Sequence, residues 1–362
     1  MEAIICNMEK RVTYHEQTDL ENTIKLRSVL KTLPDFARDY FRASSITTST
    51  NTRCKYAYDI RVFFQFLISE NPAYKNYEIR DFRLDDLDRI TALDLEEYIE
   101  YLKVYRDPKT GSLITNGEKG IKRKLSALRT FYAYYYKHEL IRTNPTLLID
   151  MPKLHKKDII RLDAGEVASL LDLVETGTDA SMSAHQRSYY EKNRVRDLAI
   201  LTLLLGTGIR VSECVGLDLE DVDFRNGGIR VVRKGGNEMM VYFGDEVARA
   251  LEDYIENDRA AVTPVPGHEH ALFYSSQRKR IGVKTVENMV KKYARQVTST
   301  KKITPHKLRS TYGTALYQET GDIYLVADVL GHKDVNTTKT HYAAMSDARR
   351  RSAAKAVQLR ED

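Results

Sequence analysis

Apolar side chains recur at intervals of three or four residues along most of this chain, and this period constrains its fold more than any other feature. Two such sets are Tyr56, Ile60, Phe63 and Leu67, and Leu125, Leu128, Tyr132 and Tyr135. This spacing places each set on one face of an α-helix. We therefore expect an all-helical first domain over residues 34–150. Residues 1–33 are polar without a strong period, and we expect a weakly ordered or short helical extension there.

A second domain is expected over residues 158–362, after a short basic linker with a proline at residues 151–157. Two β-branched runs, 229–233 and 239–243, flank a turn with two glycines and predict a hairpin. The expected fold class of this domain is therefore mainly α with a small β-sheet (α+β). Residues 176–194 break the pattern and are predicted to form a surface loop. The expected helices are 284–297, 306–319, 322–330 and a cationic last helix over 346–359.

Local signals place some helix ends in this second domain. Asp163, followed three residues later by Glu166, matches the capping box that begins a helix. Gly331 stands directly after the helix predicted over 322–330, where a C-terminal glycine is preferred. We expect helices to begin and end at these residues.

The net charge of +6 is concentrated in one stretch of the chain. Between Thr115 and Lys157, ten lysines and arginines accompany three acids, so this stretch carries +7 and the rest sums to −1. Concentrated positive charge suits a polyphosphate partner. A solvated helix face is an equally common origin of such a run, so charge alone does not decide between the two.

Composition excludes several classes of protein. Hydrophobic residues make up 42% of the chain, which is enough for ordinary cores, and no apolar run is long enough to span a bilayer. The N-terminus lacks a secretory pattern, so we expect a cytoplasmic protein. Cys6, Cys54 and Cys214 show neither a paired framework nor metal-ligand spacing. We therefore expect no structural zinc.

Four short segments of the second domain carry residues suited to phosphate chemistry. They are TGIRVSE around Arg210, Lys234 at the hairpin turn, HKLRST with His306 and Arg309, and LGHKDVNTTK with His332, followed by Tyr342. Each segment alone is ordinary, and Tyr342 is one of 23 tyrosines. The informative feature is their order within one domain: Arg, Lys, His-x-x-Arg, His and Tyr.

This ordered set resembles the active site of the tyrosine recombinase (integrase) family. The segment RKLSALRTFY at 123–132 also resembles the family's core DNA-binding domain, and the resemblance covers roughly residues 34–350. The step of ten residues from His332 to Tyr342 is similar to phage and conjugative-element integrases, whereas nine is common in chromosome-resolving members. His341 occupies the nine-residue position. The resemblance implies site-specific DNA recombination through a 3′-phosphotyrosyl intermediate.

By this resemblance Tyr342 is the nucleophile. A phenol oxygen can attack phosphorus and leave again, so the energy of the DNA backbone is kept in the covalent intermediate. Arg210 and Arg309 are expected to bind the non-bridging phosphate oxygens, because a guanidinium is always charged and presents a fork of donors. Lys234 is the expected general acid for the 5′ oxygen leaving group.

The two histidines are assigned by the same resemblance. His306 is an expected acid–base partner of the tyrosine hydroxyl, and His332 is an expected hydrogen-bond donor to the phosphate. We expect no metal, nucleotide or other cofactor, because the sequence has neither a two-metal carboxylate cluster nor a phosphate-binding loop.

The resemblance further implies that the two domains bind duplex DNA between them. The expected DNA contacts are Lys122, Arg123, Lys124, Arg129, Lys156 and Lys157. The last helix would be donated to a neighbouring subunit in a tetrameric synapse, and a mobile element is the expected source of the enzyme. Two alternatives stay open: a monomeric DNA-relaxing topoisomerase with the same chemistry, and a catalytically inactive DNA-binding protein. The second is less favoured because every expected side chain is present.

Overall fold

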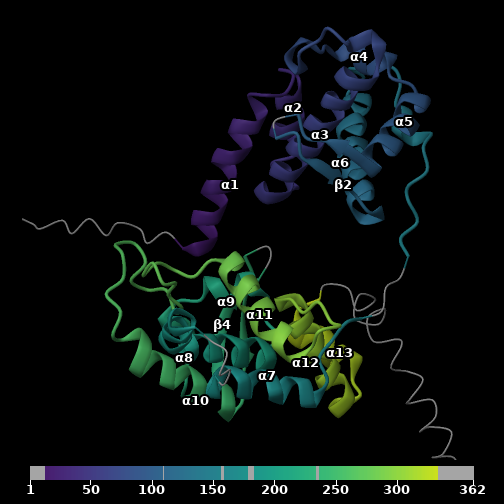
Figure 1. The fold of residues 1–362 in the computed structure, drawn as a ribbon. Helices are drawn as coiled ribbons and strands as arrows, with labels where there is room; N and C mark the ends of the chain where they lie inside the picture. Colours follow the sequence, from purple (N-terminus) through teal and green to yellow (C-terminus); the bar gives the residue numbers. More distant parts are fainter. Residues whose placement is uncertain (1–12, 109, 156–158, 178–182, 234–235, 333–362) are drawn as a thin grey trace, which may run out of the picture. The chain divides into compact units, whose positions relative to one another are not determined.

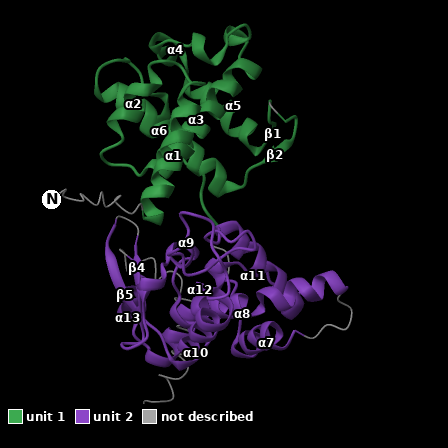
Figure 2. Ribbon diagram, turned by 90° about the vertical axis from the view of Figure 1, so that its left-hand side faces the viewer, with its two compact units in different colours: residues 1–156 green, residues 157–362 purple. Residues whose placement is uncertain are grey.

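The computed structural model describes residues 13–108, 110–155, 159–177, 183–233 and 236–332 (Figure 1). The chain divides into two compact units, residues 1–156 and 157–362 (Figure 2). The predicted cationic helix over 346–359 lies outside the described residues. The same holds for four of the predicted site residues, Lys156, Lys157, Lys234 and Tyr342.

Unit 1 is helical, with one short hairpin between its last two long helices. Its elements are α1 (Tyr14–Leu30), α2 (Ala37–Ala43), α3 (Thr50–Glu70), α4 (Leu84–Arg89), α5 (Ala92–Lys103), β1 (Val104–Arg106), β2 (Leu113–Thr115) and α6 (Glu118–Lys137). Single helical turns occur at Pro72–Tyr74, Ile79–Asp81 and Pro145–Leu147. The strands β1 and β2 pair antiparallel and enclose a turn-rich loop.

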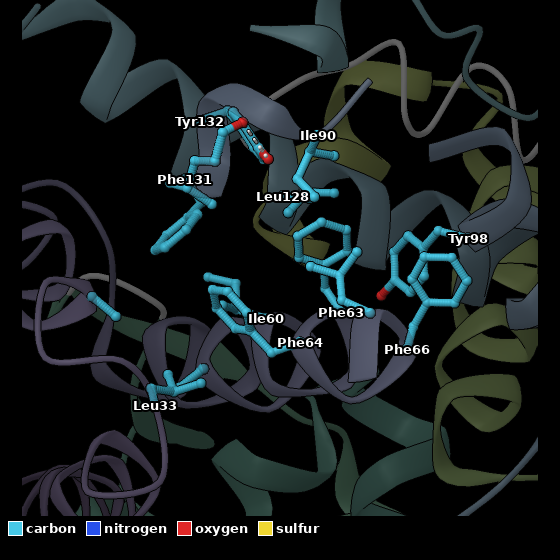
Figure 3. Packing of buried hydrophobic residues seen from close by; sticks show 14 of the residues in the cluster. Leu33, Ile60, Phe63, Phe64, Phe66, Ile90, Tyr98, Leu128, Phe131 and Tyr132 are labelled. Atoms are coloured by element: carbon cyan, nitrogen blue, oxygen red, sulfur yellow. Dashed lines mark hydrogen bonds between the residues drawn. The ribbon is translucent and has the colours of Figure 1, made fainter. Parts of the chain in front are cut away.

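The two helices predicted from apolar spacing supply much of the unit 1 core. Figure 3 shows Ile60, Phe63 and Phe64 of α3 opposite Leu128 and Phe131 of α6, and all five are buried. The rings of Phe64 and Phe131 meet edge to face with centroids 6.4 Å apart, a favoured aromatic geometry. Burial of each such side chain stabilises the fold by about 1.5–3 kcal/mol.

The N-terminal segment is more ordered than its polar sequence predicts. Helix α1 begins after Thr13, whose side chain and that of Glu16 form a capping box. The helix packs against α3, and its residues Leu26 and Val29 are buried in the unit 1 core. Of the two alternatives expected for this segment, the helical one holds for residues 14–30, and this helix is part of the unit 1 core rather than a separate extension.

Unit 2 is mainly helical with one small sheet. Its elements are α7 (Ala164–Thr176), α8 (Ala184–Thr207), α9 (Val211–Gly216), β3 (Val222–Asp223), β4 (Gly228–Val232), β5 (Glu238–Tyr242), α10 (Asp245–Asp253), α11 (Val283–Val297), α12 (Pro305–Thr320) and α13 (Ile323–Leu330), with single helical turns at Leu219–Asp221 and Tyr254–Arg259. The three strands pair antiparallel in the order β3-β4-β5. The predicted mainly α fold with a small sheet is confirmed.

Helix α8 is the central element of unit 2, since α7, α10 and α12 all pack against it. Its six consecutive residues 199–204 are all buried, as expected for a helix covered on several faces. The helix begins at Ala184 after a capping box of Ser183 and Gln186. The predicted surface loop over 176–194 is therefore wrong for residues 184–194, which form the first three turns of α8.

Candidate active site

Arg210 lies at the junction between α8 and α9. Helix α8 ends at Gly208, which adopts the left-handed conformation with φ of +63°. Arg210 then caps α9: its backbone N–H and its Nη1 donate to the two oxygens of Glu213, at 2.8 and 2.7 Å. The Glu213 side chain is buried and that of Arg210 is 36% exposed. Glu213 therefore holds one side of the guanidinium while part of it remains accessible.

Gly208 is required at this junction for two reasons. L-residues rarely adopt its positive φ, and a Cβ there would lie 2.3 Å from Cδ1 of Tyr312. We expect Gly208→Ala to lower the free energy of unfolding of unit 2 by about 2–4 kcal/mol, from left-handed strain plus overpacking. Denaturant unfolding of the full chain measures the change.

Gly165 is the matched control for this substitution. It lies exposed in the first turn of α7, where an added Cβ meets only an ordinary contact at 3.4 Å. Gly165→Ala is expected to be neutral or to stabilise by about 0.5–1 kcal/mol, because alanine restricts the unfolded chain. Equal unfolding free energies for the two variants would contradict the role assigned to Gly208.

Arg309 reaches the same junction from α12. Pro305 occupies the first turn of this helix, and Arg309, a residue only 4% exposed, follows one turn later. Its Nη1 donates to the carbonyl of Gly208 at 2.5 Å, and its Nη2 donates to the carbonyl of Leu330. Arg309 therefore ties the end of α8 to the end of α13.

The end of α13 brings the two predicted arginines together. Gly331 ends this helix in the left-handed conformation, as predicted. Arg210 donates from Nη2 to the carbonyl of Gly331 at 3.4 Å, next to the Leu330 carbonyl that accepts from Arg309. The negative end of a helix dipole favours such cations. Two guanidiniums from segments about 100 residues apart in sequence thus meet at neighbouring peptide groups.

The two predicted histidines flank this junction. His332 follows Gly331 directly, is half-buried, and donates its backbone N–H to the carbonyl of Ala327 at 2.9 Å. His306 is exposed on the first turn of α12, three residues before Arg309. The structure therefore brings Arg210, Arg309 and His332 together at the end of α13, and it places His306 one helical turn from Arg309.

An arginine that the sequence analysis did not single out reaches the same helix end. Arg233, between β4 and the hairpin turn, donates from Nη2 to the carbonyl of Val329 at 2.8 Å. Arg233 directly precedes Lys234, and this position was the one feature of the sequence that could have drawn attention to it. Nothing in the sequence alone shows that its side chain turns inward rather than toward solvent.

The phage integrase family model matches residues 161–349, just over half of the chain. The chain is also 33% identical to the tyrosine recombinase XerC of Caldanaerobacter subterraneus, over 84% of this chain and 81% of that protein. This chain belongs to the phage integrase family of tyrosine recombinases. It is therefore a DNA strand-transferring enzyme, as the order of the motifs predicts.

Other relatives place the recombinase in the same family. It is 30% identical to the tyrosine recombinase XerS of Streptococcus uberis, over 89% of this chain and 95% of that protein. Two solved structures share its fold. XerH bound to a palindromic difH substrate has a TM-score of 0.59 and 18% identity, and the match covers 84% of this chain and 79% of XerH. The Tn1549 transposon integrase in complex with a circular intermediate DNA has a TM-score of 0.60 and 19% identity, and the match covers 87% of this chain and 98% of the integrase chain. None of these relatives favours the topoisomerase alternative.

Several of the basic residues predicted to contact DNA have partners inside unit 1 of the recombinase. Lys124 is buried and donates to Oδ1 of Asn116 at 2.8 Å. Arg129 donates to the carbonyls of Thr146 and Ile149 at 3.1 and 2.6 Å. The bond of Lys124 holds Asn116, which precedes α6, against that helix, and the bonds of Arg129 hold the segment after it. Both side chains therefore have partners within unit 1.

Arg123 and Lys122 remain at the surface of α6. Arg123 is 45% exposed but forms an ion pair with the buried Asp59. Burial raises the pKa of Asp59 to about 6, although the charges of Arg123 and Lys124 lower it. Lys122 is half-buried.

Neither a metal site nor a membrane span was found in the described part of the recombinase. No three side chains among the described histidines, cysteines, aspartates and glutamates gather in a way that could hold a metal ion. No helix in the described ranges is long and apolar enough to cross a membrane.

Proposed function

We propose that this recombinase cleaves and rejoins duplex DNA at specific sites, with Tyr342 as nucleophile and a 3′-phosphotyrosyl intermediate. The observation that carries this proposal is the meeting of Arg210 and Arg309 at the end of α13. Tyr342 lies ten residues beyond His332, which follows that helix. Two solved structures of similar fold are bound to a palindromic difH substrate and to a circular intermediate DNA, which supports DNA as the substrate.

The two guanidiniums would bind the non-bridging oxygens of the scissile phosphate. The pentavalent transition state carries more negative charge on these oxygens than the ground state does, so fixed cations lower the barrier. Glu213 and the carbonyls at Gly208, Leu330 and Gly331 hold the two side chains before substrate arrives. This arrangement avoids reorganisation during the reaction.

The remaining roles follow from chemistry and position. Lys234 would protonate the 5′ oxygen as the P–O bond breaks, because an alkoxide is a poor leaving group. His306 would exchange a proton with the Tyr342 hydroxyl, and His332 would donate a hydrogen bond to a phosphate oxygen. Both histidines lie within a few residues of the arginine junction, which supports these assignments.

Covalent capture from a DNA library tests the proposed function. The full chain is incubated with a duplex library of random sequence carrying one nick, and the DNA attached to protein is sequenced. A motif of two inverted arms is expected, and its match to the ends of a mobile element would support the role suggested by the ten-residue step. Capture without sequence preference, with relaxation of a plasmid lacking the motif, would instead support a topoisomerase.

Lys122 is the proposed phosphate contact of α6. Lys122→Gln is expected to weaken binding to all duplex sequences and to lower the slope of log K against log[salt] by about one unit. Fluorescence anisotropy at several salt concentrations measures this slope. Lys137, exposed at the other end of α6, is the control. Equal slopes for the two glutamine variants would remove the assignment.

We further propose that four copies assemble on two DNA sites through the cationic segment 346–359. Its charges and alanines suit a helix that packs on a neighbouring copy. Sedimentation of the full chain with DNA carrying one site or two tests the assembly. Four copies on paired sites are expected, and loss of that species without loss of single-site binding is expected after deletion of residues 346–362. Unchanged assembly by the truncated chain would contradict the proposal.

A further inference from the structure

The side chain of Arg233 leaves the β4–β5 hairpin and enters the active-site junction. Its backbone closes the hairpin: its N–H donates to the carbonyl of Asn237 at 2.8 Å and its carbonyl accepts from Gly236 at 3.0 Å. Its guanidinium, by contrast, donates to the carbonyl of Val329 in α13. The residue is only 9% exposed. Arg233 therefore connects the base of the hairpin turn to the end of a helix about 100 residues later.

The carbonyl groups at the end of α13 show how this connection fits the site. A helix leaves its last four carbonyls without partners in the helix. The first two, of Ala327 and Asp328, accept from the backbone of His332 and Gly331 at 2.9 and 2.7 Å. The next three carbonyls in sequence accept from three arginines of three different segments: Val329 from Arg233, Leu330 from Arg309 and Gly331 from Arg210.

Gly331 makes room for Arg233. A Cβ at Gly331 would lie 1.3 Å from Nη1 of Arg233, so any other residue there would displace the guanidinium. Gly331 also has a φ of +59°, which by itself favours glycine. Gly331 thus ends α13 and also leaves space for the Arg233 guanidinium, which donates to the carbonyl of Val329 in that helix.

Stability does not account for an arginine at this place. Nε and Nη1 of Arg233 are buried and have no hydrogen-bond partner among the residues that the structure describes. Buried donors without partners are costly, and an apolar side chain of similar size often replaces a buried cation without loss of stability. An arginine at this position is better explained by a role in holding the neighbouring segments in place.

We infer that Arg233 is a positioning residue that fixes the base of the hairpin turn on the end of α13 and thereby aims Lys234. Consecutive Cα atoms are about 3.8 Å apart, so anchoring Arg233 restricts where the next side chain can reach. Arg233 thus couples the hairpin to the same helix end that holds the two proposed phosphate-binding arginines. This inference rests on the proposed role of Lys234 as general acid.

A sulfur-substituted substrate isolates this role. When sulfur replaces the 5′ bridging oxygen of the scissile phosphate, the Tyr342 oxygen bonds to phosphorus, the P–S bond breaks, and a thiolate leaves without needing a proton. Loss of the general acid then no longer matters. Single-turnover cleavage of oxygen and sulfur substrates is compared for wild type, Arg233→Met, Arg233→Lys, Lys234→Met and the double methionine variant.

Arg233→Met is expected to slow cleavage of the oxygen substrate by about 10²-fold, a typical effect of misplacing a catalytic group. It should cleave the sulfur substrate near the wild-type rate, and the double variant should be no slower than Lys234→Met. Arg233→Lys keeps the charge and a long side chain but not the forked donors, so it should show a smaller loss with the same rescue. If Arg233→Met fails to fold, the comparison of the two substrates is made with Arg233→Lys alone.

Arg230→Met is the control, since Arg230 lies on β4, three residues before Arg233, and is 52% exposed and paired with Asp221. It should cleave both substrates normally. An equal defect of Arg233→Met on both substrates, or no defect, would overturn the inference. If Lys234→Met itself is not rescued by sulfur, the proposed general acid is wrong. If the sulfur substrate rescues the Arg233 variants but not Lys234→Met, Arg233 aims a different acid, and this result also overturns the inference.

Discussion

Tyr342→Phe is expected to form no covalent adduct with DNA while binding duplex as tightly as the wild type. The substitution removes only the phenol oxygen that would attack phosphorus, so the positive surface that binds the backbone is unchanged. The adduct is measured on a nicked duplex, where loss of the short fragment beyond the cleavage site prevents religation, and its yield is read by denaturing gel electrophoresis.

The matched control is Tyr324→Phe, the same chemical change in the same unit. Tyr324 is 71% exposed on α13, close in sequence to the arginine junction but without an assigned role. It should form the adduct at the wild-type rate. An adduct from the Tyr342→Phe protein would show that another residue is the nucleophile.

Arg309→Gln is expected to slow the first-order rate of adduct formation by about 10²–10³-fold, which corresponds to about 2.7–4 kcal/mol of barrier. Glutamine can still donate to one carbonyl, but it has no charge for the developing oxyanion. Affinity for duplex should change little, because one phosphate contact among many contributes modestly to binding. Single-turnover cleavage at saturating protein measures the rate.

Arg309 also donates to the carbonyls of Gly208 and Leu330, so its substitution can lower the stability of unit 2 as well as the cleavage rate. The free energy of unfolding is therefore measured for each variant together with the rate. Arg309→Lys is the informative companion, because lysine keeps the charge but lacks the fork that spans the two carbonyls. It should be slower than wild type and faster than the glutamine variant, with both variants folded at the assay temperature. Wild-type cleavage by Arg309→Gln would contradict the proposed role.

Much of unit 2 could be predicted because its signals are local. Gly331, Asp163 with Glu166, and the glycine-rich turn each act within a few residues, and the structure has the corresponding helix ends and hairpin. The order of the motif residues predicted the family. This order can be read in the sequence whatever the lengths of the loops between the motifs.

The full extent of two helices was not predicted, because their stability comes partly from tertiary packing. Residues 14–30 and 184–194 are polar with weak period, and their helices are buried along only part of their length. The capping boxes of Thr13 with Glu16 and Ser183 with Gln186 were readable in the sequence. They would have indicated both helix starts.

The inward direction of charged side chains could not be predicted. Lys124 lies within a run of positive charge, yet its ammonium is buried beside Asn116. Arg233 precedes a proposed catalytic lysine, yet its guanidinium turns to α13. The charges of such residues are visible in the sequence, but the partners to which their side chains turn are set by the fold.

Mass spectrometry of the peptide that carries DNA after trapping on a nicked duplex tests directly whether Tyr342 is the nucleophile. We expect a nucleotide attached to the oxygen of Tyr342, through the 3′ phosphate of the DNA. Attachment to His341, to any other residue or through a 5′ phosphate would contradict this expectation.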